Sequence, residues 1–353
     1  MKTFIRFTKK LVCLLALGAG LMTAQDLQQQ LSKLGHDAAV GYITPILSGW
    51  GNDLNSGIYY SADLHDVLGF DIGVKFAMSQ VTDADKTFSL TMPATMTMNA
   101  SDLGYTGFPS GTTITLHSTG PDPNYPASVT ANTAVGAKEE VLVKTLGGFG
   151  ELKNGSVTTP VPVPAGRTIL PLPPGYDWGK TGVPLPMPQL NVGLPFGIEF
   201  MLRYIPTVSN DAGKFSYMGF GLRYNIDQWI PFCPVDIAVH FMTQKMNFKS
   251  KADADIFSAT GTAYGFEASK KLFIVTLYGG FQLENSTLTL NDFQGYNPEI
   301  GQSVTIPGFE VKGSNKSRIT VGARLLLLIV NVHAEYSIAK NPVITLGAGI
   351  SIR

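Results

Sequence analysis

The sequence is poor in cysteine, in charged residues and in long apolar runs. It has two cysteines among 353 residues, and 15% of its residues are charged, against about 25% in an average soluble domain. Cys13 lies in an N-terminal apolar segment, which leaves Cys233 alone in the rest of the chain. One cysteine excludes an internal disulfide scaffold and a cysteine-based metal cage. Beyond the first 24 residues, no apolar run approaches the roughly 18–20 residues of a membrane-spanning helix.

The chain also lacks an excess of basic residues. Its 26 Lys and Arg residues balance 26 Asp and Glu residues, so the formal net charge is zero. Four of the basic residues lie within the first ten positions, and without them the net charge is −4. No basic field remains to attract phosphates, so nucleic acid is not an expected partner.

The N-terminus has the order of an export signal. Met1–Lys10 is basic, Leu11–Leu21 is apolar, and Met22–Ala24 offers a cleavage site before Gln25. This order predicts that residues 1–24 are a signal peptide, and the apolar part is too short to span a bilayer. An exported protein of this kind is periplasmic, secreted or an outer-membrane barrel, and the strand pattern has to decide between these.

Apolar and polar residues alternate along most of the chain after Leu190. In one run, Met218, Phe220, Leu222 and Tyr224 face away from Arg223 and two glycines. Several runs reach about 9–11 residues, the length of a tilted strand that crosses the hydrocarbon layer. Aromatic residues lie near the ends of the apolar faces, as in an interfacial girdle. We therefore predict an all-β protein, a transmembrane antiparallel β-barrel; a soluble β-sandwich is the alternative, because it alternates too.

The prediction divides the mature chain into an N-terminal part and a barrel. Residues 25–56 hold a short amphipathic helix over Leu27–Leu34, which Gly35 ends, and then a Gly-rich stretch from Tyr42. This part either plugs the barrel lumen or is a periplasmic helix that leads into the first strand. Residues 57–353 form the barrel, with roughly 11–14 strands, of which Gly57–Asp63, Phe70–Ser79 and Thr87–Thr97 precede the insert. Because bacterial single-chain barrels have even strand numbers, we expect 12 or 14.

A long insert interrupts the barrel at about residues 98–189. Nine prolines lie between Thr159 and Gln189, and proline is excluded from central strands. We expect an irregular Pro-rich loop with short strands at Thr112–His117 and Glu140–Thr145. A loop of this length is functional or folded on itself, for example as a cover over the barrel mouth.

Charged residues on the polar strand faces are the candidate functional residues. A Lys or Arg that faces lipid costs about 2–4 kcal/mol at the bilayer midplane, so these side chains are expected to point into the lumen. They either pair to brace the wall or line a ligand path, for which the three arginines come first. The residues are Arg203, Arg223, Arg324, Glu199, His240, Glu267, His333 and Glu335, accompanied by Asp71 and Lys75.

No motif for catalysis or for metal binding is present. Gly-x-Ser-x-Gly, His-Glu-x-x-His, P-loop and Cys-x-x-Cys patterns do not occur. Ser337 shares a strand face with His333, but the two lie two pleats apart on one strand. Asp253 and Asp255 are read as solvated turn residues rather than calcium ligands. We expect a protein that is not an enzyme and has no cofactor and no metal.

Four segments resemble a known group of proteins. They are Leu54–Gly57 (LNSG), Pro188–Pro195 (PQLNVGLP), Arg203–Pro206 (RYIP) and Gly219–Pro231 (GFGLRYNIDQWIP). Together they look like a family of uncharacterised bacterial outer-membrane β-barrel proteins, which is distantly similar to the FadL-like transporters of hydrophobic compounds. The resemblance implies a lumen plugged by the N-terminal segment and a lateral route for hydrophobic ligands. The Asn-Pro-Ala hatch motif expected of a fatty-acid transporter is absent.

These observations predict an outer-membrane protein of a Gram-negative-type bacterium. Its expected partners are outer-membrane lipid and a small hydrophobic ligand. The expected function is that of a passive channel or facilitator for small molecules, hydrophobic ones included. The alternative is a structural or surface-interaction barrel whose Pro-rich insert binds an extracellular partner. A transporter should show a lumen gap and a movable plug, whereas an interaction barrel should show a filled lumen and an ordered insert.

Overall fold

A computed structural model describes residues 36–154, 157–177, 179, 182, 184–209, 213–251, 253–297 and 302–352. The chain forms two compact units. The first contains residues 46–82 and 180–353, and the second contains residues 34–45 and 83–179. The predicted signal peptide and the predicted helix over Leu27–Leu34 lie outside the described residues. No helix in the described part of the chain is both long and apolar enough to cross a bilayer.

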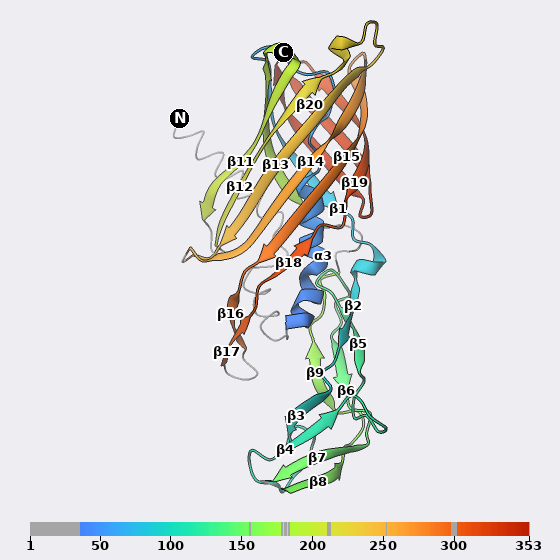
Figure 1. The fold of residues 1–353 in the computed structure, drawn as a ribbon, viewed down its shortest axis with the longest axis vertical. Coiled ribbons are helices and arrows are strands. Elements are labelled where there is room, and N and C mark those ends of the chain that lie inside the picture. The colour runs from blue at the N-terminus through green and yellow to red at the C-terminus, as the bar shows by residue number, and fades with distance from the viewer. Residues whose placement is uncertain are drawn as a thin grey trace. The chain divides into compact units, whose positions relative to one another are not determined.

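The first unit is a closed antiparallel barrel of ten strands (Figure 1). Neighbouring strands follow the order β14-β13-β12-β11-β10-β1-β21-β20-β19-β15, and pairing of β14 with β15 closes the ring. The strands are β1 (Phe70–Ser79), β10 (Leu185–Leu194), β11 (Ile198–Ser209), β12 (Lys214–Asn225), β13 (Asp236–Lys249), β14 (Asp255–Leu272), β15 (Val275–Leu290), β19 (Ser317–Leu327), β20 (Val330–Ile338) and β21 (Val343–Ile352). Closure leaves no free sheet edge, which is a requirement for strands in lipid.

The expected 12 or 14 strands are therefore wrong. The segment Gly57–Asp63 was counted as a strand, but it has no strand structure. Residues Thr87–Thr97 were counted as a barrel strand, but they form β2 (Thr87–Thr91) and part of β3 (Thr95–Asn99) in the second unit. Alternation of side chains marks a strand but not its partners, because barrel and non-barrel strands share the same two-residue period.

The outer wall of the barrel is apolar, and its inner wall is polar. Along β12, Met218, Phe220 and Leu222 are each at least half exposed, whereas the next residue, Arg223, is buried. The same arrangement recurs on the other strands, where the large exposed apolar side chains include Ile72, Val239, Phe241, Tyr264, Phe266, Leu277, Ile319, Val321, Val332, Tyr336, Leu346 and Ile350. Water would penalise this arrangement, whereas a hydrocarbon solvent favours it.

The two ends of the barrel differ in their connections. One end has connections of at most ten residues, between β10 and β11, β12 and β13, β14 and β15, and β19 and β20; this is the short-turn end, and the helical turns η2 (Pro195–Gly197) and η3 (Asp227–Trp229) lie here. The other end has short turns between β11 and β12, β13 and β14, and β20 and β21, together with the two longest connections of the barrel. There the chain leaves β1 for the second unit, and β16 (Phe293–Asn297) and β17 (Gln302–Ile306) form a hairpin before β18 (Phe309–Lys312) pairs with β15.

A helix precedes the barrel in the sequence. α3 spans His36–Leu54 and includes Pro45. Its buried residues Ala39, Tyr42, Ile43, Ile46 and Leu47 follow the three- and four-residue spacing of one helix face. The expected Gly-rich turn segment from Tyr42 is thus wrong up to Leu54, because this buried stripe outweighs the cost of a proline and three glycines in the helix.

The second unit is rich in short strands. It contains η1 (Asp83–Asp85) and three small sheets, with the strand orders β2–β5, β3–β4–β7–β8 and β6–β9. The strands not yet given bounds are β4 (Thr113–His117), β5 (Ser128–Asn132), β6 (Val141–Lys144), β7 (Phe149–Asn154), β8 (Val157–Pro162) and β9 (Thr168–Leu172). Its buried side chains include Ile114, Leu116, Tyr125 and Val143. The unit has a packed interior of its own.

The expectation of an irregular Pro-rich loop over residues 98–189 is wrong in part, because the insert holds several paired short strands. The two expected short strands, Thr112–His117 and Glu140–Thr145, are confirmed as β4 and β6. Prolines 160 and 162 of the insert lie in β8, an outer strand of its sheet, where a missing N–H donor is tolerated. Pro186 and Pro188 belong to the barrel strand β10. They lie before Gln189, the first residue of β10 that pairs with β11, so β11 needs no N–H donor from them.

Candidate functional site

The candidate site is the barrel lumen, which the chain's own N-terminal segment occupies. After α3, residues Asn55–His65 run along the lumen without strand structure, and most of them are buried. We call Asn52–His65 the plug segment. A segment without strand or helix partners has to find other partners for its backbone groups, and side chains of the barrel wall provide them.

Arg203 of β11 is the most heavily bonded of these wall residues. Its guanidinium donates to the carbonyl oxygens of Leu54 at 2.8 Å and Ser56 at 2.7 Å. It also donates to the side-chain oxygens of Gln189 at 2.9 Å and Gln244 at 3.1 Å. The side chain is fully buried. A single arginine therefore ties the plug segment to three strands of the wall.

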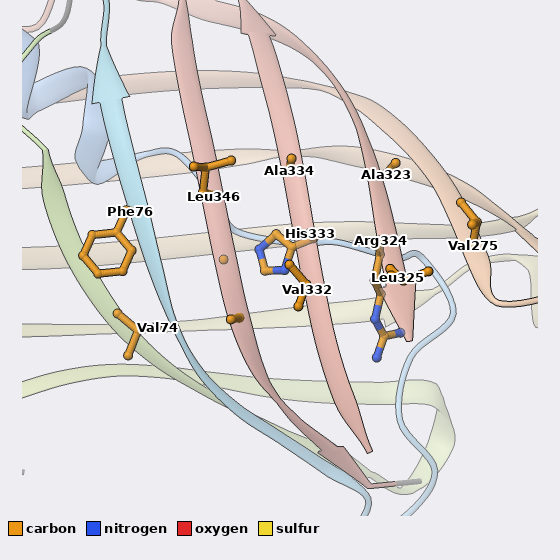
Figure 2. A pocket seen from close by; sticks show the side chains of 12 residues that line it. Val74, Phe76, Val275, Ala323, Arg324, Leu325, Val332, His333, Ala334 and Leu346 are labelled. Atoms are coloured by element: carbon orange, nitrogen blue, oxygen red, sulfur yellow. The ribbon is translucent and has the colours of Figure 1, made fainter. Parts of the chain in front are cut away.

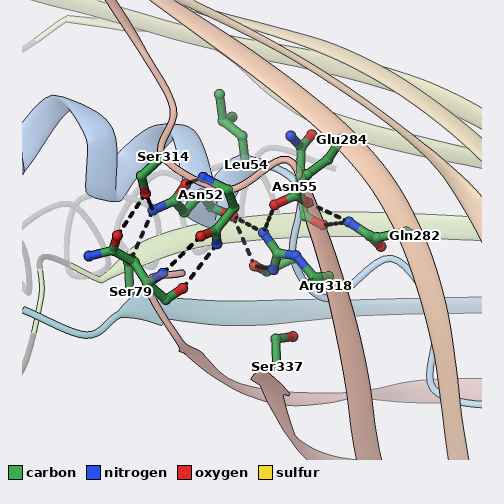
Figure 3. A network of polar contacts seen from close by, with 12 residues as sticks. Asn52, Leu54, Asn55, Ser79, Gln282, Glu284, Ser314, Arg318 and Ser337 are labelled. Atoms are coloured by element: carbon green, nitrogen blue, oxygen red, sulfur yellow. Dashed lines mark hydrogen bonds and ion pairs between the residues drawn. The ribbon is translucent and has the colours of Figure 1, made fainter. Parts of the chain in front are cut away.

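A second arginine holds the start of the plug segment (Figure 3). Arg318 of β19 donates to the carbonyl oxygen of Asn52 at 2.7 Å and to the hydroxyl of Ser56, and it pairs with Glu284 at 2.7 Å. Beside it, the Gln282 amide donates to the carbonyl of Asn55 at 2.9 Å. Arg318 lies six residues before Arg324 on the same strand, so both side chains point to the same face of the sheet. This spacing is the signal in the sequence that marks Arg318 as a further lumen residue.

Four of the predicted residues form one ionic cluster on neighbouring strands. Arg223 lies between Glu199, at 2.7 Å, and Glu267, at 2.8 Å. His240 Nδ1 contacts the other oxygen of Glu267. The guanidinium also donates to the carbonyl of Ser61 in the plug segment. Burial of these charges is tolerable because each has a partner of opposite charge.

Three other predicted residues, together with Lys75, surround Tyr60 and Gly57 of the plug segment. The Arg324 guanidinium lies 4.5 Å from the centre of the Tyr60 ring, and the His333 ring lies 5.1 Å from it. Glu335 accepts a hydrogen bond from the Gly57 amide at 2.9 Å. Lys75 donates to the Gly57 carbonyl from the opposite side. A backbone bracketed by a carboxylate and an ammonium has both of its polar groups satisfied.

All eight predicted residues lie on the inner wall and are buried. The structure brings four of them together around Arg223 and three around Tyr60 and Gly57, while Arg203 binds the plug segment separately. The wall residues that sequence reasoning missed are mostly uncharged amides, and no charge pattern marks them: Gln189, Gln244 and Gln282. Their role depends on the backbone of the plug segment beside them.

A hollow of about 730 Å³ lies on the wall formed by β1, β21, β20, β19 and the start of β15 (Figure 2). Small outward-facing residues form its floor, among them Ala323, Ala334 and Ala348, and Phe76 and Leu346 border it. Almost all of its lining is apolar. The hollow can therefore accept an apolar group but offers it no polar recognition.

Two further candidates from the sequence are accounted for by local contacts. Asp253 pairs with Lys214 at 2.5 Å, and Lys249 pairs with Asp255 at 3.1 Å. The Ser337 hydroxyl lies 2.9 Å from that of Thr320 rather than near His333. In the described part of the chain, no three His, Cys, Asp or Glu side chains are placed to hold one metal ion.

Comparison with known families gives one match over nearly the whole chain. The model of a family of unknown function, DUF6588, matches residues 1–352. The chain belongs to DUF6588. No match was found among curated proteins. The expected likeness to FadL-like transporters is not shown.

Solved structures that resemble this DUF6588 chain are outer-membrane proteins at low similarity. A bacterial polysaccharide outer-membrane secretin is 8% identical, with 82% of this chain and 100% of that chain covered and a TM-score of 0.27. The β domain of the Bordetella autotransporter BrkA is 10% identical, with 81% and 99% covered and a TM-score of 0.27. The outer-membrane channel DcaP of Acinetobacter baumannii is 10% identical, with 80% and 96% covered and a TM-score of 0.19. At these TM-scores the similarities carry no argument about function.

Proposed function

We propose that this protein is an outer-membrane β-barrel that its own N-terminal segment keeps closed, and that it anchors the unit of residues 83–179 at the cell surface to bind an extracellular partner. The membrane assignment is carried by the inversion of the usual pattern of a soluble protein, with apolar side chains on the outside of the barrel wall and charged side chains on the inside. Large apolar side chains such as Phe220 and Tyr264 are half exposed outside, and charged ones such as Arg203 and Glu199 are buried inside. A closed barrel with this inversion suits a bilayer.

The bonds of the plug segment support a closed barrel rather than an open pore. Arg203, Arg223, Arg318, Lys75, Glu199 and Glu335 all bind its backbone. A hydrogen bond to a charged group contributes about 1.5–3 kcal/mol. Even with strong non-additivity, removal of the segment costs on the order of 10 kcal/mol. A passive channel that opens at this cost conducts rarely.

The orientation follows from the connections between strands. Outer-membrane barrels have short periplasmic turns and longer extracellular loops. The connection between β1 and β10, which forms the second unit, leaves from the end opposite to the short-turn end. The second unit is then extracellular. Its packed interior favours a folded module that binds a partner over a flexible loop.

The experiment is cysteine labelling in intact cells. In a Cys233→Ser background, Ser110→Cys places a thiol on the second unit, and Gln228→Cys places one in a short turn; both positions are exposed. A membrane-impermeant maleimide should label residue 110 in intact cells, and residue 228 only after the outer membrane is permeabilised. The reverse pattern contradicts the display role. In liposomes, the full chain should show no steady conductance.

The second candidate function is that of a facilitator for small hydrophobic molecules, as the FadL-like resemblance implies. The hollow at Ala323, Ala334 and Ala348 favours it, since it offers an apolar seat on the outer wall. Uptake of a hydrophobic dye into liposomes that contain the full chain measures this role. Ala334→Leu, which fills the hollow, should reduce the uptake if the hollow is part of the route, whereas Val321→Leu on the same wall should not.

A further inference from the structure

A serine, a histidine and a carboxylate form a hydrogen-bonded series in the lumen. Ser351 Oγ lies 3.0 Å from His65 Nε2, and His65 Nδ1 lies 2.6 Å from Glu199 Oε2. Ser351 belongs to β21, Glu199 to β11, and His65 to the plug segment. This is the order nucleophile, general base and orienting carboxylate of serine hydrolases, which is recognised by geometry rather than by sequence position.

The protonation pattern of the series suits a nucleophile. A carboxylate only accepts hydrogen bonds, so the neutral imidazole carries its proton on Nδ1 and leaves Nε2 to accept from the Ser351 hydroxyl. Glu199 is itself held by Arg223 at 2.7 Å, and it also accepts from the His65 amide at 3.2 Å. The ring of His65 is thereby fixed in one orientation and one tautomer.

A cation lies beside the serine oxygen. Arg324 Nη2 is 3.1 Å from Ser351 Oγ, and the guanidinium rests over the Tyr60 ring. When a hydroxyl adds to a carbonyl group, negative charge develops on an oxygen close to the new bond. A fixed donor at this place stabilises that charge. Simple bracing of the plug segment does not require a cation at the hydroxyl.

The series lies at the short-turn end of the barrel. Glu199 is the second residue of β11, and Ser351 precedes the last residue of β21. His65 and Ser351 keep 7% and 5% of their surface exposed, whereas Glu199 keeps none. An opening at this end would therefore reach the serine and the histidine before the carboxylate.

Apolar side chains mark the same end. Leu68, Phe196, Phe232, Phe273 and Leu328 occupy its turns and the entry to β1, each is at least 78% exposed, and each has a φ between 57° and 68°. Positive φ is costly for bulky residues, so this recurrence points to a use for the exposed side chains. An apolar rim favours substrates with an acyl chain over polar ones.

We propose that Ser351, His65 and Glu199 are a catalytic triad that hydrolyses carboxylic esters of apolar acyl chains. His65 Nε2 takes the Ser351 proton as Oγ bonds to the ester carbonyl carbon, and Arg324 donates to the resulting oxyanion. The intermediate collapses with cleavage of the ester C–O bond, and the leaving alcohol receives the proton from His65. Water, deprotonated by His65, then attacks the acyl-serine and releases the carboxylic acid, and the proton returns to Ser351.

The experiment uses the full chain in detergent micelles. A fluorophosphonate probe should label the protein, and mass spectrometry of the digest should place the adduct on Ser351. Hydrolysis of p-nitrophenyl butyrate and p-nitrophenyl decanoate should be measurable and should fall at least a thousandfold in Ser351→Ala. Ser337→Ala is the matched control, because Ser337 is another buried lumen serine without a histidine partner; labelling and hydrolysis should persist.

Glu199→Gln tests the orienting role by its effect on the kinetic parameters of the folded variant. It should lower kcat with little change in KM and alter the pH profile of kcat, and Glu199→Asp should restore part of the rate. Absence of labelling and of hydrolysis in the unmodified chain overturns the proposal, as does an adduct at any serine other than Ser351. Because the adduct is mapped on the unmodified protein, a variant that fails to fold leaves this test intact.

Discussion

Removal of the Arg203 side chain tests the closed barrel directly. Arg203→Met keeps much of the apolar stem and deletes the guanidinium that binds the carbonyls of Leu54 and Ser56 and the amides of Gln189 and Gln244. The variant leaves these oxygens buried and without this donor. Each buried acceptor left without a donor costs about 1–3 kcal/mol, so the loss of several of these bonds is expected to cost about 3–5 kcal/mol. At roughly 1.4 kcal/mol per decade, the plug segment should leave its place about a thousandfold more often.

Two measurements follow this change. The melting temperature of the barrel in detergent should fall by several degrees, since a loss of 1 kcal/mol lowers it by about 2–4 °C in a chain of 150–250 residues. Conductance across a planar bilayer should change from rare events to frequent openings. Lys214→Ala is the control, because this partly exposed residue pairs with the exposed Asp253 and such surface pairs contribute little. An Arg203→Met barrel that melts and conducts like the parent protein would refute the argument that wall charges hold the plug segment.

Three further predictions address the wall and the start of the plug segment. Phe220→Lys should lower the free energy of unfolding by about 2–4 kcal/mol in lipid vesicles, whereas Thr287→Lys, on a partly exposed polar position of β15, should lower it by less than 1 kcal/mol in the same chemical-denaturation assay. Gly347→Ala should destabilise the barrel by about 1–3 kcal/mol, because the new Cβ would lie 2.2 Å from the His333 ring; an unchanged melting curve contradicts this. Burial raises the pKa of Asp53 well above its usual value, and the opposing effect of Arg318 is weaker. The free energy of unfolding of the parent protein should therefore fall as pH rises above the unfolded-state pKa near 4. Asp53→Asn should remove this pH dependence of the free energy of unfolding between pH 5 and 8.

The sign of the Asp53 prediction follows from proton binding. An acid with a raised pKa in the folded state holds its proton there while the unfolded chain has already released it. Stability from this group is therefore complete at low pH and declines as pH rises toward the folded-state pKa. A depressed folded-state pKa would give the opposite slope, so unfolding curves at several pH values distinguish the two cases.

The sequence was informative about faces and uninformative about partners. Alternation along a strand follows from backbone geometry alone, and the inward positions of residues such as Arg203 and His333 could be predicted from it. Membership of the barrel depends on hydrogen bonds between distant segments, so β2 and β3 could not be distinguished from barrel strands. The strand count failed for that reason.

The helix α3 shows a second limit. Pro45 and the glycines of Tyr42–Gly57 suggested turns, but the buried stripe of α3 has helical spacing. Local propensity is worth about 1–3 kcal/mol per glycine or proline, which is less than burial of several large apolar side chains contributes. A period analysis that ignored residue type would have found the helix up to Leu54.

Contacts between the plug segment and the wall lay beyond any analysis of strand pattern. Strand pattern relates a serine to a histidine only where both lie on strands, as Ser337 and His333 do. The pair that exists joins Ser351 to His65, a residue outside every strand. Its position depends on the path of the plug segment, which is fixed by wall side chains from β11, β19 and β21 together.

The same wall charges explain why the lumen is polar although the segment within it is partly apolar. A peptide that crosses the lumen without regular structure presents unpaired carbonyl and amide groups, and each buried group left unpaired costs about 1–3 kcal/mol. Arginine, with five donors on one planar group, satisfies several acceptors at once. Arg203 binds two carbonyls of the plug segment, and Arg318 binds one carbonyl and the Ser56 hydroxyl. Glu335 and Glu199 serve the amides of Gly57 and His65 in the same way. The inward charges are therefore complementary to a backbone rather than to a diffusing solute, and this is the physical ground for an anchoring barrel.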